Sequence, residues 1–140
     1  MTRKVCVDCR REGIKTHRKA SFPGPRCATH HRRRKKELSQ RRHHAHIKET
    51  YGITGEEYRA LYEAQGGRCA ICQRATGARR RLAVDHDHRT GQIRGLLCKT
   101  CNYKVLGHLR DDPEALQRAI NYLKNPPAFA VIGRKEVPHG

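Results

Sequence analysis

Residues 69–102 read CAICQRATGARRRLAVDHDHRTGQIRGLLCKTCN, and they contain the strongest structural signal of the chain. Two Cys-x-x-Cys pairs, Cys69/Cys72 and Cys98/Cys101, enclose a short segment. Four thiolates at this spacing are typical of a closed tetrahedral zinc site, which leaves no open position for chemistry. Any chemistry is therefore expected from the residues that the zinc holds in place.

Between the two cysteine pairs stands the run Asp85-His86-Asp87-His88, and Asn102 follows directly on the last cysteine. A carboxylate and an amide supply the oxygen ligands that Mg²⁺ prefers. An imidazole titrates near neutrality, as a general base should. The combination indicates a second, catalytic metal and a histidine base.

Structural alternatives exist for each of these residues. Asp85 is alternatively a strand-end cap, Asp87 or His88 a turn residue, and Asn102 a helix cap. The DHDH run is alternatively a second structural zinc site, although carboxylates are the minority choice in closed zinc sites.

The seven cysteines are the staples that a small core needs, because the chain of 140 residues has no tryptophan and only two phenylalanines. No apolar run is long enough for a membrane span, and the N-terminus does not resemble a secretory signal. An odd number of cysteines in such a chain favours metal sites in a cytoplasmic protein over a disulfide framework.

Residues 1–31 are predicted to form an N-terminal zinc-finger-like unit. A C-x-x-C … C-x-x-H pattern surrounds a polar, turn-rich segment that has little to bury without a metal. His31 is an alternative fourth ligand and His17 a weaker one, and unliganded reduced thiols are the alternative without a metal. The zinc ligands that the spacing favours are Cys6, Cys9, Cys27 and His30.

Positive charge is concentrated in residues 1–50, which hold 16 of the 31 basic residues but only 4 of the 13 acidic ones. A field of this sign attracts phosphate backbones, so DNA is the expected partner. Residues 32–50 are predicted to be a basic helical linker, polar all round, which is either solvated or bound to DNA. The side chains expected to contact DNA are Arg32, Arg33, Arg34, Lys35, Lys36, Arg41 and Arg42, with Arg79, Arg80 and Arg81 beside the core.

The third predicted segment, residues 51–125, begins with a helix. Thr54 and Glu57 form a capping box, Tyr58 lies on the apolar face, and Gly66-Gly67 ends the helix. Strands are expected at residues 82–84 and 92–97, and a helix from Cys98 to about Leu109. A last helix from Asp112 to Asn125 is predicted to bury Ala115, Leu116, Ala119, Ile120 and Leu123. Residues 126–140 are expected to be a mobile tail or a docking strand.

The order strand, DHDH, strand and helix with Asn102 resembles the His-Me finger, or HNH, nucleases. Residues 51–124 are similar to the phage recombination endonuclease VII family in the four core cysteines, the DHDH run and the Cys101–Asn102 junction. The resemblance implies a small, zinc-stapled α+β fold, with a ββα-metal (His-Me finger) core, flanking helices and an N-terminal zinc finger.

The same resemblance implies roles for single residues. Asp85 and Asn102 would hold a catalytic Mg²⁺, with Mn²⁺ as a substitute, and His86 would be the general base. His88 would contact the scissile phosphate. The structural zinc ligands of the core would be Cys69, Cys72, Cys98 and Cys101.

The function that follows is a Mg²⁺-dependent DNA endonuclease for branched or junction DNA, similar to a Holliday junction resolvase, leaving 5′ phosphate and 3′ hydroxyl ends. Two alternatives stay open: a less selective HNH nicking or homing-type endonuclease, and a catalytically inactive zinc-finger DNA-binding module. Symmetric nicking favours a homodimer. The resemblance implies that this would be a swapped helical dimer, supported here by residues 29–65 and 113–124. The expected location is the cytoplasm, that of the host if a phage encodes the chain, and no membrane partner is expected.

Overall fold

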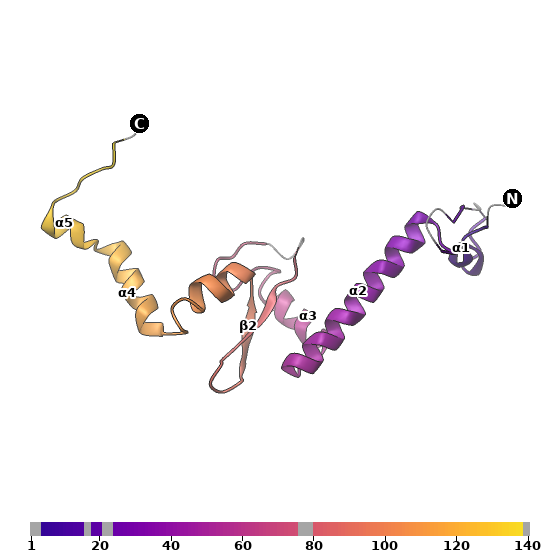
Figure 1. The fold of residues 1–140 in the computed structure, drawn as a ribbon, viewed down its shortest axis with the longest axis horizontal. Helices are drawn as coiled ribbons and strands as arrows, with labels where there is room; N and C mark the ends of the chain where they lie inside the picture. The colour runs from indigo at the N-terminus through magenta and orange to yellow at the C-terminus, as the bar shows by residue number, and fades with distance from the viewer. Residues whose placement is uncertain (1–3, 16–17, 21–23, 76–79, 139–140) are drawn as a thin grey trace. The chain divides into compact units, whose positions relative to one another are not determined.

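The structure is a computed structural model that describes residues 4–15, 18–20, 24–75 and 80–138 (Figure 1). Within these ranges it contains helices and one two-stranded sheet, so the protein is a small α+β protein. The chain divides into two compact units, Met1–Ala60 and Leu61–Gly140. Among the described helices, none combines the length and hydropathy that a membrane span requires.

The first unit begins with a small cysteine-centred fold. Helix α1 (Val7–Arg11) follows Val5 in the chain. Val5 forms an isolated antiparallel bridge with Lys19, which comes after the helix. Its buried centre consists of three cysteines, with Ile14 packed against them. Because so little apolar surface is buried here, the stability of this part depends on what the cysteines bind.

Helix α2 (Ala28–Tyr51) continues directly from this centre (Figure 1). Its 24 residues would span about 36 Å at 1.5 Å per residue. Of its side chains only His30 and Ile47 are buried, which agrees with the sequence prediction of a helix that is polar all round. It ends at Gly52, whose φ of 72° is a left-handed conformation that glycine adopts without strain.

Helix α3 (Gly55–Ala64) starts with the predicted capping box. The Thr54 amide donates to Glu57 Oε2 at 2.7 Å, and the Glu57 amide donates to Thr54 Oγ1 at 3.1 Å. Tyr58 is buried, with the His43 ring of α2 edge-on against it at a centroid distance of 4.7 Å. At Gly55, the first residue of α3, a Cβ would overlap the His44 ring, so a larger residue there would force the His44 side chain to move.

The sheet of the second unit pairs β1 (Ala83–His86) with β2 (Ile93–Leu97) in antiparallel register. Leu82, Val84 and Leu96 are buried and form its core side. The Gln65 side chain extends this pairing, because its Oε1 accepts from the Leu96 amide and its Nε2 donates to the Leu96 carbonyl.

The register changes once along this sheet. Asp85 pairs with Gly95 but His86 pairs with Ile93, so Arg94 is the extra residue of a β-bulge. A bulge bends its strand and redirects a side chain, and bulges are common beside functional sites.

A π-helix, η2 (Cys101–Leu106), follows the sheet and is the observed form of the helix predicted to run to about Leu109. The Gly107 amide donates to the Asn102 carbonyl at 3.1 Å, the wide spacing that defines this helix type. A turn then leads to α4 (Pro113–Lys124), with Asp112 as its N-cap.

The apolar face of α4 is not buried, although the sequence analysis predicts that it is. Leu123 is 76% exposed and Ile120 43% exposed, because no described element of the chain packs over them. The segment beyond α4 contains a short helix, α5 (Pro127–Val131), where the sequence analysis expects a tail or a docking strand.

Candidate metal clusters and functional site

The N-terminal cluster brings three cysteines and one histidine to a single point. Nδ1 of His30 lies 3.3 Å from each sulfur of Cys6, Cys9 and Cys27, and all four side chains are buried. Such separations fit the edges of a tetrahedron around Zn²⁺ with Zn–S bonds of about 2.3 Å. The fourth position is filled by His30 and not by His31, and His17 lies outside the described residues.

Glu12 completes the surroundings of His30, and the sequence analysis missed it. Its Oε2 lies 3.0 Å from His30 Nε2, and its Oε1 accepts from Arg33 Nη2. A carboxylate only accepts, so Nε2 carries the proton and Nδ1 is left free to bind a metal. The hydrogen bonds from Arg33 and His30 hold the pKa of Glu12 below its ordinary value. The signal in the sequence was an acid inside a cysteine-bracketed loop.

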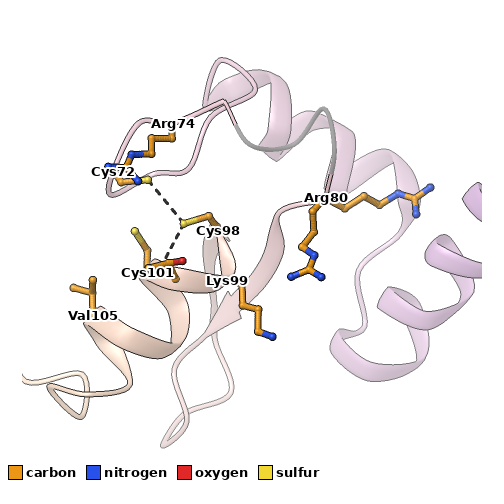
Figure 2. A pocket seen from close by; sticks show the side chains of 9 residues that line it. Cys72, Arg74, Arg80, Cys98, Lys99, Cys101 and Val105 are labelled. Atoms are coloured by element: carbon orange, nitrogen blue, oxygen red, sulfur yellow. Dashed lines mark hydrogen bonds between the residues drawn. The ribbon is translucent and has the colours of Figure 1, made fainter.

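The core cluster gathers Cys69 and Cys72 from the loop after α3 and Cys98 and Cys101 from the end of the sheet. Their ligand atoms all lie within 4.8 Å of one another. Figure 2 shows the sulfurs of Cys72, Cys98 and Cys101 turned toward each other, and the Cys72 and Cys98 sulfurs are 3.9 Å apart. Both clusters therefore have the predicted composition and can hold structural zinc.

The thiols of both clusters have strongly shifted pKa values. Burial raises the pKa of Cys9 to about 11 and that of Cys101 to about 12. In Cys6 and Cys69 burial acts in the same direction, but hydrogen bonds from backbone amides outweigh it and lower the pKa to about 6. Each cluster thus favours at least one thiolate, whose charge a bound cation would neutralise.

A pocket of about 390 Å³ opens beside the core cluster (Figure 2). Cysteines of the cluster form one part of its lining, and basic side chains form another. Predicted DNA contacts Arg80 and Arg81 are among them, whereas Arg79 lies outside the described residues. The basic side chains that line the pocket are Arg74, Arg80, Arg81 and Lys99.

Asp85 is buried, at 4% exposure, and holds a forked ion pair that the sequence analysis did not predict. Arg94 Nε donates to its Oδ2 at 2.7 Å and Arg94 Nη2 to its Oδ1 at 2.9 Å. The guanidinium reaches Asp85 from the bulge of β2, which explains why strand alternation alone would not have found the pair. The hydrogen bonds that Arg94 donates to the Asp85 carboxylate raise the pKa of Arg94.

The two histidines of the DHDH run lie together. The ring centroids of His86 and His88 are 4.7 Å apart, and His86 is half-buried while the His88 side chain is 72% exposed. His88 Nδ1 lies 3.2 Å from Oδ2 of Asp111, a residue that the sequence analysis did not single out. The signal for Asp111 was an acid directly before an Asp-Pro helix start, with no capping role of its own.

Asp87 and Asn102 have distinct backbone roles. Asp87 Oδ1 accepts from the amides of Arg89 and Thr90, both at 2.8 Å, so it organises the turn between the strands. Asn102 is the second residue of η2, inside the helix and not at its cap, which is Thr100. Asp87 is therefore a turn residue, as one of the structural alternatives suggested. Asn102 is not a helix cap, which was the structural alternative for that residue.

Part of the basic segment in α2 is already paired. Arg33 donates to Glu12, and Arg34 Nη1 lies 3.7 Å from Glu37 Oε2. Arg32, Arg41 and Arg42 are exposed. Because Arg33 supports the N-terminal cluster through Glu12, its substitution would disturb more than a surface charge.

Comparison with known proteins defines the class of the chain. Residues 44–125 match the family described as recombination endonuclease VII, and the chain belongs to that family. The family implies a nuclease that acts on DNA in recombination.

Two relatives are phage proteins that resemble almost the whole chain. The Gene 59 protein of Mycobacterium phage D29 is 58% identical over 136 residues, covering 97% of this chain and 82% of the relative. The Gene 59 protein of Mycobacterium phage L5 is 55% identical, over 97% of this chain and 83% of the relative. No solved structure gives a significant match.

Proposed function

We propose that the chain is a Mg²⁺-dependent DNA endonuclease of the HNH type that cuts branched or junction DNA. The observation that carries the proposal is the grouping of Asp85, His86 and His88 at one end of a two-stranded sheet that leads into a four-cysteine cluster, in a chain of the endonuclease VII family. The order β1, β2 and η2 supports a ββα-metal core, since η2 carries Asn102 directly after a cluster cysteine.

The donor atoms on the chain fit a magnesium ion. Asp85 is a buried carboxylate, and Asn102 contributes an amide, which together are the oxygen ligands that Mg²⁺ favours. Arg94 occupies one position on each Asp85 oxygen, and an ionised carboxylate has about four acceptor positions. Asp85 and Asn102 would hold the ion, which when bound would stabilise charge developing on the phosphate.

His86 is the proposed general base. Its half-buried position limits water around the ring, and an imidazole takes a proton from water near neutral pH. The exposed His88 ring, 4.7 Å away between centroids, is proposed to contact a phosphate of the substrate. Zinc in the two clusters is proposed to be structural, with the core ion fixing the end of β2 relative to the loop after α3.

DNA binding is proposed to use two cationic surfaces. One is the exposed arginines of α2, and the other is the basic lining of the pocket beside the core cluster. Such side chains neutralise phosphates without reading base sequence, which suits an enzyme that recognises the shape of DNA.

A homodimer is proposed to use the exposed apolar face of α4. Fully burying one such leucine stabilises a protein by roughly 1.5–3 kcal/mol. Leu123→Glu is therefore expected to shift the protein toward monomers in sedimentation analysis, and to lower its melting temperature only as far as loss of the dimer does. Val137→Glu, in an equally exposed part of the second unit, is the matched control. A monomeric wild type would contradict the dimer.

The decisive test compares a four-way junction, a linear duplex and a supercoiled plasmid as substrates, with Mg²⁺ and with EDTA. We expect Mg²⁺-dependent paired nicks near the branch point of the junction, and slower cleavage of the duplex. Equal rates on all three substrates would favour the less selective nicking enzyme. No cleavage of any substrate by zinc-loaded protein, with Mg²⁺ or Mn²⁺, would favour the inactive DNA-binding module.

A further inference from the structure

Asp111 joins the candidate site from a distant part of the chain. Its Oδ2 lies 3.2 Å from His88 Nδ1, although the two residues are 23 positions apart. The same oxygen lies 3.3 Å from Arg94 Nη2, and Arg94 in turn holds both oxygens of Asp85. A continuous chain of polar contacts therefore runs from Asp85 through Arg94 and Asp111 to His88.

The backbone around Asp111 is held in an unusual conformation. Arg110 and Asp111 have φ values of 55° and 58°, the left-handed region that residues with a side chain rarely adopt. Hydrogen bonds from their amides to the carbonyls of Gly107 and Leu106 hold the turn after η2. Aspartate is among the side-chain-bearing residues that adopt this conformation most readily, so the turn can present the Asp111 carboxylate without a glycine.

The contact with His88 selects one form of the imidazole. Hydrogen bonds from His88, and then from Arg94, hold the pKa of Asp111 below its ordinary value, so its carboxylate is ionised at neutral pH. An ionised carboxylate only accepts hydrogen bonds, so Nδ1 of a neutral His88 must carry the proton. A free histidine side chain favours the proton on Nε2, so the contact with Asp111 reverses that preference. The lone pair on Nε2 is then directed away from Asp111.

Arg94 gives Asp111 a fixed orientation. Its guanidinium is itself held by two bonds to the buried Asp85, and its side chain leaves the strand at the bulge. Because a planar fork with two partners has little rotational freedom, the third contact to Asp111 is made at a defined place. Asp87 does not compete for this role, since its Oδ1 accepts from the two turn amides.

We propose that Asp111 is a positioning residue of the nuclease centre, which fixes the His88 imidazole with its proton on Nδ1 and is itself oriented by Arg94. The proposal rests on the proposed function, in which His88 contacts the substrate phosphate. Carboxylates that orient a metal-ligating histidine typically contribute about 10- to 100-fold to affinity or activity, and an effect of the same order is expected for a carboxylate that orients His88.

The test combines a double-mutant cycle with a direct measurement of the His88 tautomer. Asp111→Ala is expected to lower kcat about 10- to 100-fold, with KM for DNA, zinc content and melting temperature little changed. In a His88→Ala background the same substitution is expected to cost less than about 3-fold, since residues that act together are not additive. The matched control is Asp112→Ala, which removes the neighbouring acid and the α4 cap but no contact to His88.

The tautomer is read from long-range ¹H–¹⁵N NMR of the imidazoles, above the pH at which they titrate. His88 is expected to carry its proton on Nδ1 in the wild type and to shift toward Nε2 in Asp111→Ala, and to stay unchanged in Asp112→Ala. The proposal is overturned if either kcat or the tautomer is unchanged in Asp111→Ala, or if that variant loses as much activity in the His88→Ala background.

Failure of the proposed nuclease function can be distinguished from failure of the proposed role of Asp111. A wild type that cleaves no substrate would defeat the nuclease assignment, while the tautomer measurement would still decide whether Asp111 fixes His88.

Discussion

The two metal clusters use the same chemistry to support different parts of the molecule. The N-terminal cluster has a histidine ligand in the first turn of α2, so its metal would anchor a long cationic helix. The core cluster has only thiolates and follows the end of β2, in the sheet whose other strand carries Asp85 and His86. We therefore expect the first cluster to govern DNA binding and the second to govern chemistry.

The strongest test of this division removes one ligand from each cluster. Cys69→Ser is expected to leave one zinc per chain and to abolish cleavage, because the loop after α3 is no longer fixed to the end of β2 and the start of η2. Cys9→Ser is also expected to leave one zinc, but to raise the DNA concentration for half-maximal cleavage with kcat largely retained. Metal analysis and steady-state kinetics give both readouts. Loss of kcat in Cys9→Ser would show that the N-terminal cluster also governs chemistry.

A second test separates chemistry from binding within the core. His86→Ala is expected to lower the cleavage rate about 10²- to 10⁴-fold, the usual contribution of a general base, without weakening DNA binding. His108→Ala removes an exposed histidine of the same unit and is the control. Single-turnover rates and gel-shift affinities are measured side by side. A parallel fall in affinity would make His86 a binding or structural residue instead.

A third test concerns the residue behind the N-terminal cluster. Glu12→Gln is expected to weaken zinc binding at that site about 10-fold, because His30 loses a charged partner that fixes its tautomer. Competition with a chromophoric chelator measures this affinity, and Glu37→Gln on α2 is the control. Unchanged zinc affinity in Glu12→Gln would show that the contact has no effect on the metal.

The same carboxylate gives a pH dependence of defined sign. The pKa of Glu12 is lowered in the folded protein, so its support is fully present above the pKa of the unfolded chain. That support is lost as pH falls through the lowered value. Acidification below about pH 4.5, the ordinary pKa of glutamate, is therefore expected to reduce the stability difference between wild type and Glu12→Gln. A difference that grew with acidity would contradict the assignment.

The smallest expected effect concerns the exposed arginines of α2. Replacing Arg32, Arg41 and Arg42 with glutamine should flatten the plot of log K against log salt by roughly 0.9 for each phosphate that is no longer neutralised, with kcat unchanged. Arg33 is left in place because it binds Glu12. The control removes equal charge at Lys124, Arg134 and Lys135. An identical slope in wild type and the α2 variant would mean that α2 is a solvated strut.

Local spacing was enough to predict the features whose partners lie close in the chain. Cys-x-x-Cys pairs place two thiolates on one tight turn, so the ligand sets of both clusters followed from the sequence. The capping box of Thr54 and Glu57 and the end of α3 at Gly66-Gly67 were predictable for the same reason. The DHDH run, and Asn102 directly after Cys101, were recognisable because their order along the chain resembles that of a known family.

Only the tertiary structure decided which side chains meet those residues. Arg94 reaches Asp85 because the register slips by one residue, a shift that alternation of strand residues does not encode. Asp111 reaches His88 through a turn of two left-handed residues, neither of which is a glycine. The periodicity of α4 predicted an apolar face but not its exposure, because periodicity defines a face and burial depends on what packs against it. Residue types and spacing thus predicted the candidate metal ligands of this protein, and long-range packing determined the partners that orient its candidate catalytic groups.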